Sequence, residues 1–169
     1  MFYRSITFIG LLLFFVSQNA IAQTAMGTLA VTATVGSVST CLLNSVTPMI
    51  FPNYNPINSN SDDATASISV TCGTGIPYDV GIDEGHGIGA TEDDRIMTEA
   101  SPETTGLLPY GLFQNSNHTD NWGDIIGKDT LHRVGNNLPQ LLTVYGKINA
   151  GQVVEPGVYM DMVTVIVTF

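Results

Sequence analysis

A two-residue alternation near the start of the chain constrains the fold more than any other feature. From Gly27 to Val35 one face carries Leu29, Val31, Ala33 and Val35, and the other carries Thr28, Ala30, Thr32 and Thr34. A period of two is typical of a β-strand. The chain closes on a second alternating run, Val163 to Phe169. The pattern therefore predicts a strand at each end, and end strands with open edges favour sharing a strand with a neighbour.

Residues 1–22 have the three parts of a secretory signal peptide. Arg4 is the basic residue, Ile9 to Val16 form the apolar run, and Ala20-Ile21-Ala22 is a small-x-small site before Gln23. A membrane-spanning helix is the alternative, but the run is shorter than the roughly 20 residues that cross a bilayer. We exclude residues 1–22 from the fold, and we expect export without membrane insertion.

The residues from Gln23 onward suit one domain with one hydrophobic core. The whole chain has a formal net charge of −10, and one of its five basic residues, Arg4, lies in the leader. Such a surface repels nucleic acid and anionic lipid. Composition thus excludes a nucleic-acid partner, but it identifies no other partner.

The two cysteines, Cys41 and Cys72, both lie after the leader. An exported protein meets an oxidising compartment, so we expect one disulfide, worth roughly 3 to 4 kcal/mol in the chain-entropy model. A metal pair or a redox motif is the alternative, and it requires closer spacing or further ligands.

Short alternating runs separated by turn residues predict an all-β fold. The expected strands are Cys41 to Ser45, an edge strand over Pro48 to Pro52, Ala66 to Cys72, Tyr78 to Ile82, a short one over Arg95 to Thr98, Leu107 to Phe113, Leu141 to Ile148, and Val163 to Phe169. Asp83 to Gly106 and Gln114 to Pro139 are expected as long loops. About seven strands at this spacing favour an immunoglobulin-like β-sandwich.

No residue pattern indicates catalysis or a metal or cofactor site. His86, His118 and His132 are scattered over polar loops without zinc-ligand spacing. Gly85-His-Gly87-Ile-Gly89 lacks a third glycine at the spacing of a nucleotide-binding loop and has no following helix, and no G-x-S-x-G elbow is present. We expect no enzyme, no metal and no cofactor. We assign Trp122 and Tyr110 to the core rather than to a sugar-binding surface.

Motifs along most of the chain resemble those of spore coat U domains, which are also the subunits of archaic, Csu-type chaperone-usher pili. They are Cys41, Phe51-Pro-Asn-Tyr-Asn-Pro56, Ile68 to Cys72, Gly75-Ile-Pro-Tyr78, Arg95-Ile-Met97, Leu108 to Phe113, Trp122-Gly-Asp124, Leu142 to Lys147 and Gly157 to Asp161. The resemblance implies an incomplete immunoglobulin-like sandwich that lacks its last strand. It also implies a periplasmic chaperone, an outer-membrane usher and donation of an N-terminal strand to the next subunit.

On this basis residues 23–36 are expected to form a donor-strand segment and residues 37–169 the sandwich. Leu29, Val31, Ala33 and Val35 would enter a neighbour's groove, although the same pattern also suits an ordinary first strand of the chain's own sandwich. Val163, Val165, Val167 and Phe169 are assigned to the acceptor edge. The resemblance further implies that the chaperone grips the Phe169 carboxylate.

The expected function is that of a structural subunit of a surface pilus, secreted through the periplasm, which polymerises by donor-strand exchange and supports adhesion and biofilm formation. Its partners would be neighbouring pilus subunits, the chaperone and the usher. A spore or cyst coat protein is an alternative with the same fold and export route. A tip adhesin is a less favoured alternative, because the chain has room for the pilin domain alone.

Overall fold

The structure, a computed structural model, describes residues 40–100 and 106–169, and all regular secondary structure within these ranges is β. The nine strands are β1 (Cys41–Val46), β2 (Asp62–Cys72), β3 (Pro77–Ile82), β4 (Arg95–Glu99), β5 (Leu107–Phe113), β6 (Leu131–Val134), β7 (Gln140–Ile148), β8 (Tyr159–Met160) and β9 (Val165–Thr168). The predicted all-β class is confirmed.

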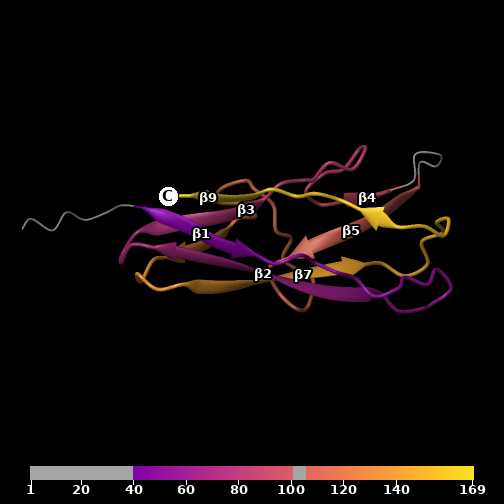
Figure 1. Cartoon of the computed structure of the whole chain (residues 1–169), viewed down its shortest axis with the longest axis horizontal. Coiled ribbons are helices and arrows are strands. Elements are labelled where there is room, and N and C mark those ends of the chain that lie inside the picture. Colours follow the sequence, from indigo (N-terminus) through magenta and orange to yellow (C-terminus); the bar gives the residue numbers. More distant parts are fainter. Residues whose placement is uncertain (1–39, 101–105) are drawn as a thin grey trace, which may run out of the picture. The chain divides into compact units, whose positions relative to one another are not determined.

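The strands form two sheets that pack as an immunoglobulin-like sandwich (Figure 1). The larger sheet has the order β1-β2-β7-β5-β4-β8, and the smaller has the order β6-β3-β9. The antiparallel pair β2 and β7 is the longest ladder, running from Asp62 opposite Ile148 to Val70 opposite Gln140. Alternation along these strands turns every second side chain inward, as the sequence predicts.

Inward-facing side chains from both sheets make one core. It comprises Ile68, Val70, Cys72, Tyr78, Val80, Ile82, Leu108, Tyr110, Leu112, Trp122, Leu142, Val144 and Ile148. Trp122 is fully buried, and its Nε1 donates a 2.8 Å hydrogen bond to the Val80 carbonyl. Trp122 and Tyr110 are therefore core residues, as predicted.

Two local expectations from the sequence are wrong, and a third is incomplete. Residues 48–52 form no strand; instead Met49 and Phe51 pack where a Cβ on Gly146 would lie, so this segment covers β7. The expected loop 114–139 contains β6, a strand of the smaller sheet. The strand expected over Val163 to Phe169 is present as β9, which pairs with β3 in the smaller sheet, but the separate strand β8 just before it, which pairs with β4 in the larger sheet, was not expected.

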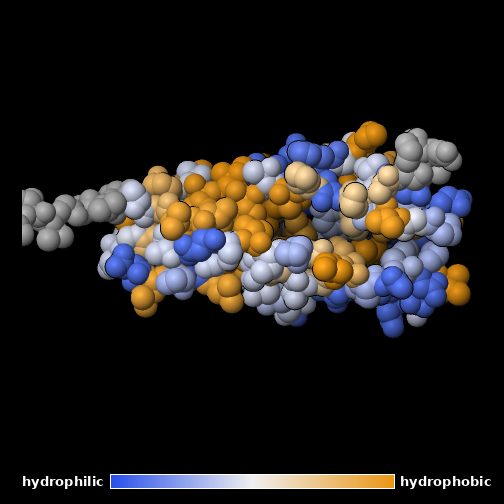
Figure 2. All heavy atoms as spheres, in the orientation of Figure 1, coloured by the Kyte–Doolittle hydropathy of each residue, from blue (hydrophilic) through white to orange (hydrophobic). Residues whose placement is uncertain are grey.

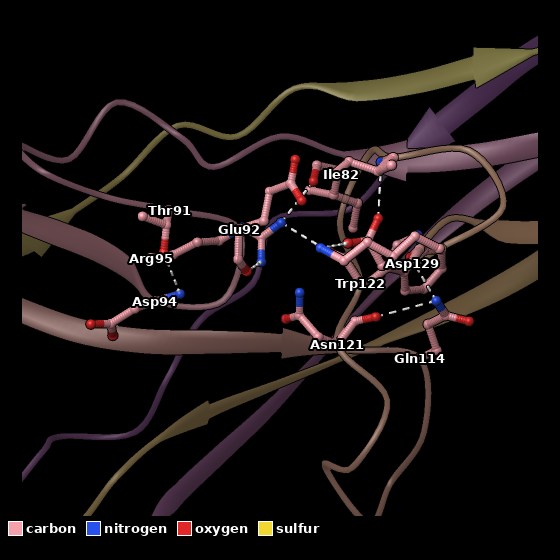
Figure 3. Close-up of polar contacts among 11 residues, drawn as sticks. Ile82, Thr91, Glu92, Asp94, Arg95, Gln114, Asn121, Trp122 and Asp129 are labelled. Atoms are coloured by element: carbon pink, nitrogen blue, oxygen red, sulfur yellow. Dashed lines mark hydrogen bonds and ion pairs between the residues drawn. The ribbon is translucent and has the colours of Figure 1, made fainter.

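A buried arginine ties the two sheets together. Arg95 is 0% exposed, and its guanidinium donates to four backbone carbonyls (Figure 3). Nε reaches Asp83 O at 2.8 Å and Nη1 reaches Glu92 O at 2.7 Å. Nη2 reaches the carbonyls of Ile82 and Trp122, each at 2.7 Å. A guanidinium carries five donors in a fixed plane, so one side chain can satisfy buried carbonyls from three separate segments.

Beside this arginine, three carboxyl groups approach the loop that follows Trp122. A Cβ on Gly123 would lie 2.6 Å from both the Asp129 carboxyl carbon and a Glu92 carboxyl oxygen, so a larger residue there would displace these side chains. A hydrogen bond with Asp124, burial, and the charges of Asp129 and Asp124 raise the pKa of Glu92 to about 7. Glu92 therefore keeps its proton to a much higher pH in the folded protein than an ordinary glutamate does.

Replacing Arg95 is expected to destabilise the fold strongly. Arg95→Met keeps much of the apolar volume but leaves four carbonyls without their donor, at an expected loss of about 3 to 5 kcal/mol in unfolding free energy. Urea denaturation followed by Trp122 fluorescence measures this loss. The matched control is Arg133→Met, because Arg133 is exposed and, among the described residues, donates only to the carbonyl of His132. A comparable small effect for both variants would contradict the role given to Arg95.

Glu92 is expected to make stability fall as the pH rises from 4.5, its ordinary pKa, to about 7. In this window the folded state retains a proton that the unfolded chain has released. The stabilisation is thus complete below pH 4.5 and is lost as the pH passes through 7. Glu92→Gln should flatten this part of the plot of unfolding free energy against pH. Above pH 7 the unfolding free energy of the variant should exceed that of the wild type by on the order of 1 kcal/mol, after allowance for solvent screening.

Urea midpoints at pH 5 and pH 8 measure the effect of Glu92→Gln, with Asp93→Asn, a change at the exposed neighbour, as the control. Parallel profiles for the wild type and Glu92→Gln would show that Glu92 does not hold the extra proton.

Candidate strand-binding groove

Two open sheet edges face each other along one side of the sandwich. Within residues 40–100 and 106–169, β9 pairs only with β3 and β1 pairs only with β2. Each is thus the last strand of its sheet in the described part of the chain. In Figure 1, β1 and β9 run along the same flank. An edge strand presents backbone donors and acceptors that can pair with another strand.

An apolar cavity of about 580 Å³ lies between these edges. One wall consists of Val46 to Phe51, the other of Tyr159 to Val165, and the floor is the inner face of the sandwich. The residues that line it are Val46, Thr47, Pro48, Met49, Phe51, Ala66, Ile68, Ile82, Met97, Tyr110, Leu112, Val144, Tyr159, Met160, Asp161, Met162, Val163 and Val165. Figure 2 shows a hydrophobic band on this face of the molecule. We call this cavity and its two edges the groove.

Hydrogen bonds made by β3 establish which backbone groups of β9 point into the groove. The Ile82 N–H donates to Gly123 O at 3.1 Å, and the Val80 carbonyl accepts from Trp122. Both residues thus direct backbone groups away from β9. Opposite residues in antiparallel strands alternate between bonded and non-bonded pairs. The partners of Ile82 and Val80, which are Val165 and Val167, therefore direct their N–H and C=O groups toward the open edge.

The side chains of the C-terminal segment divide between the two faces. Val163, Val165 and Val167 are partly buried and pack against the core, whereas Ile166 is 40% exposed and Met162 is 69% exposed. The structure thus turns inward the same three valines that were assigned to the acceptor edge. Phe169, the fourth residue of that set, is 61% exposed at the end of the chain. Its predicted role as a chaperone anchor stays a prediction.

The disulfide holds the other edge of the groove. Cys41 bonds to Cys72, and the two residues lie directly opposite each other at the start of β1 and the end of β2. The predicted bridge is confirmed. The next residues of β1 pair with β2 up to Val46, apart from an irregularity between Leu43 and Ser45. The bridge therefore fixes β1 beside β2 and leaves its other edge open.

The other predicted residues fall outside the described ranges. The donor residues Leu29, Val31, Ala33 and Val35 do so, as do the proposed signal peptide, residues 1–22, and the donor segment, residues 23–36. In the part of the chain that the structure describes, no helix has the length and apolar character needed to span a membrane. No cluster suited to a metal ion occurs among these same residues.

Sequence reasoning missed the polar residues that support the groove. Asp83 and Asp161 hold the groove wall through backbone N–H groups, and Arg95 lies beneath them. The chain has only five basic residues, and Arg95 directly precedes the apolar Ile96 and Met97. An arginine beside such residues indicates a buried side chain whose donors are all hydrogen-bonded. The two aspartates carry no comparable signal, because solvated loops also contain them.

Comparisons with known proteins identify the family. The model of the Spore Coat Protein U domain matches residues 25–166, so the chain belongs to this family and the predicted resemblance is confirmed. No significant match to this chain is found among curated proteins.

Two solved structures resemble this chain, and the first of them shows the shared fold. One is the crystal structure of the CsuC-CsuE chaperone-tip adhesion subunit pre-assembly complex from archaic chaperone-usher Csu pili of Acinetobacter baumannii, with a TM-score of 0.54 and 22% identity. That alignment covers 76% of this chain and 39% of the other, so this chain spans about two fifths of its length. Another is the E. coli Hda pilus minor tip subunit, HdaB, with a TM-score of 0.36, 18% identity, and coverage of 72% of this chain and 79% of that one.

Proposed function

We propose that the protein is a structural subunit of a surface pilus that polymerises by donor-strand exchange. The observation that carries the proposal is the groove: an apolar cavity beside β9, whose Val165 and Val167 direct backbone groups outward. A donated strand would supply ladder hydrogen bonds to this edge and apolar side chains to the cavity. The family membership supports the same conclusion.

The donated strand is residues 29–35 of a neighbouring subunit, with Leu29, Val31, Ala33 and Val35 facing the groove. Burial of each larger side chain contributes on the order of 1 to 3 kcal/mol. Backbone pairing along β9 adds to this, and the sum suits a joint that dissociates very slowly. A one-residue slip would turn the threonines of the segment inward, so the alternation also sets the register.

The same groove defines the partners and the route of export. Before polymerisation, a periplasmic chaperone would cover the apolar cavity and hold the Phe169 carboxylate, and an outer-membrane usher would release the subunit to the growing fibre. Residues 1–22 direct the chain to the periplasm, and the finished pilus lies on the cell surface, where it supports adhesion and biofilm formation. The role is structural rather than enzymatic.

A coat protein of spores or cysts is the second candidate, favoured by the family description itself. It would use the same groove, but in a deposit without filaments. Electron microscopy of cells that express the chain together with its neighbouring genes distinguishes filaments from a coat layer.

Two defective variants of the full chain are expected to rescue each other. Ala33→Asp with Val35→Asp places charges on the donor face, and Val165→Asp places one in the groove. Each variant alone should give only monomers in unheated SDS gels, whereas the wild type gives a ladder. Mixed, they should give a heterodimer and nothing longer, because one intact donor and one intact groove remain.

Matched controls place the same charges on the opposite faces. Thr32→Asp with Thr34→Asp should retain the ladder, and so should Ile166→Asp, since Ile166 is 40% exposed. Loss of the ladder in these controls, or a wild-type chain that stays monomeric, would overturn donor-strand exchange.

A further inference from the structure

The acceptor wall of the groove changes sheets at a short irregular segment. β8 pairs with β4 in the larger sheet, and β9 pairs with β3 in the smaller one. Residues 161–164 connect them and belong to no strand. Asp161, Met162 and Val163 from this segment line the groove. We call residues 161–164 the crossover. Because no regular ladder holds the crossover, its position depends on other contacts.

The Asp161 carboxylate provides the first of these contacts. Its Oδ2 accepts a 2.8 Å hydrogen bond from the Tyr110 hydroxyl, and its Oδ1 accepts from the N–H groups of His86 (2.9 Å) and Met162 (2.8 Å). Burial, followed by the hydrogen bond and charge of Asp161, raises the pKa of Tyr110, so the phenol stays a donor. Gly85 has φ of 82°, and a Cβ there would collide with this carboxylate.

Asp83 provides the second contact, and the buried arginine explains why. The Asp83 N–H donates to Thr164 O at 3.1 Å, as a ladder residue would. Its carbonyl is occupied by Arg95 Nε, so the Thr164 N–H bonds instead to the Asp83 carboxylate at 2.7 Å. Burial raises the pKa of Asp83, but the bonds from Thr164 and Gly85 and the charge of Arg95 lower it by more. Asp83 is thus held as a carboxylate.

We infer that Asp161 and Asp83 are positioning residues that hold the crossover and so align the acceptor edge for an incoming strand. The inference rests on the proposed function and concerns the same groove. The crossover directly precedes Val165 and Val167, whose outward backbone groups would pair with the donor. Because one edge of β9 is open, the strand pairs with one neighbouring strand where a central strand pairs with two. The hydrogen bonds to the two carboxylates replace part of the restraint that a second neighbouring strand would give. An edge that is already aligned captures a strand faster.

This role separates capture from final stability. Once a donor strand lies in the groove, its own ladder holds β9, and the two carboxylates become partly redundant. Asp161→Asn should therefore slow capture of the donor by about tenfold, the order expected from loss of one charge-assisted bond. It should change the melting temperature of the complex with donor much less. A merely structural role would lower the melting temperature of both forms equally.

The experiment uses the full chain carrying Ala33→Asp and Val35→Asp, which prevents polymerisation while leaving the groove intact. The probe is a fluorescent peptide of residues 23–36, and fluorescence anisotropy gives its rate of capture. Asp161→Asn and Asp83→Asn are tested in this background. Tyr110→Phe removes one of the three bonds to Asp161 and should slow capture less, so the test does not depend on one variant. Near-UV circular dichroism of Trp122 checks that each variant is folded.

The matched control is Asp79→Asn. Asp79 lies on β3, the strand that Asp83 follows, but its carboxylate accepts from Thr130 at 3.0 Å and faces His132, away from the crossover. Its variant should capture the peptide at the wild-type rate. Equal capture rates for Asp161→Asn and the wild-type groove would overturn the inference while leaving donor-strand exchange intact. Absence of capture by the wild-type groove would overturn the proposed function, and the inference with it.

Discussion

The guanidinium of Arg95 is the interaction on which the rest of the structure depends. It is fully buried and donates to four backbone carbonyls. Two are those of Ile82 and Asp83 at the end of β3, one is that of Glu92 before β4, and one is that of Trp122. Burial lowers the pKa of Arg95, but an arginine remains charged at any physiological pH. The charge is compensated by oriented carbonyls and by surrounding acidic groups rather than by one direct ion pair. One side chain thereby fixes the end of β3, and β3 pairs with β9, the proposed acceptor edge of the groove.

The effect of Arg95 on the groove is indirect but can be followed bond by bond. Because it occupies the Asp83 carbonyl, the regular ladder between β3 and the C-terminal segment stops at Ile82 opposite Val165. Beyond this pair the chain is held by the Asp83 and Asp161 side chains and moves from one sheet to the other. A wall that belongs to both sheets can leave an apolar opening between them. The polar centre of the sandwich and its apolar groove are therefore two consequences of one arrangement.

The sequence predicts the fold where side chains alternate and fails where tertiary contacts decide. The alternation in β2, β5 and β7 is strong. β5 and β7 lie within one residue of their predicted bounds, whereas β2 begins at Asp62, four residues before its predicted start. β6 was missed because its four residues, Leu131 to Val134, are mostly exposed and give no inward pattern. The segment at Met49 and Phe51 reads as an edge strand, yet it packs over Gly146 instead. The inward set of the last segment was predicted, but its change of sheets was not, because that depends on carbonyls and carboxylates distant in sequence.

The residues that line the groove also determine which interactions could hold a donated strand there. Among the residues that line it, Asp161 alone carries a charge, and its carboxylate already accepts three hydrogen bonds. None of the four basic residues of the described chain, which are Arg95, Lys128, Arg133 and Lys147, lines the groove. A strand that enters the groove as proposed would therefore gain affinity from apolar burial and backbone pairing rather than from ion pairs. These interactions are only weakly screened by salt, unlike those between exposed charges. In the proposed polymer, acidic subunits could thus join one another, because the contact between them would not depend on their like charges.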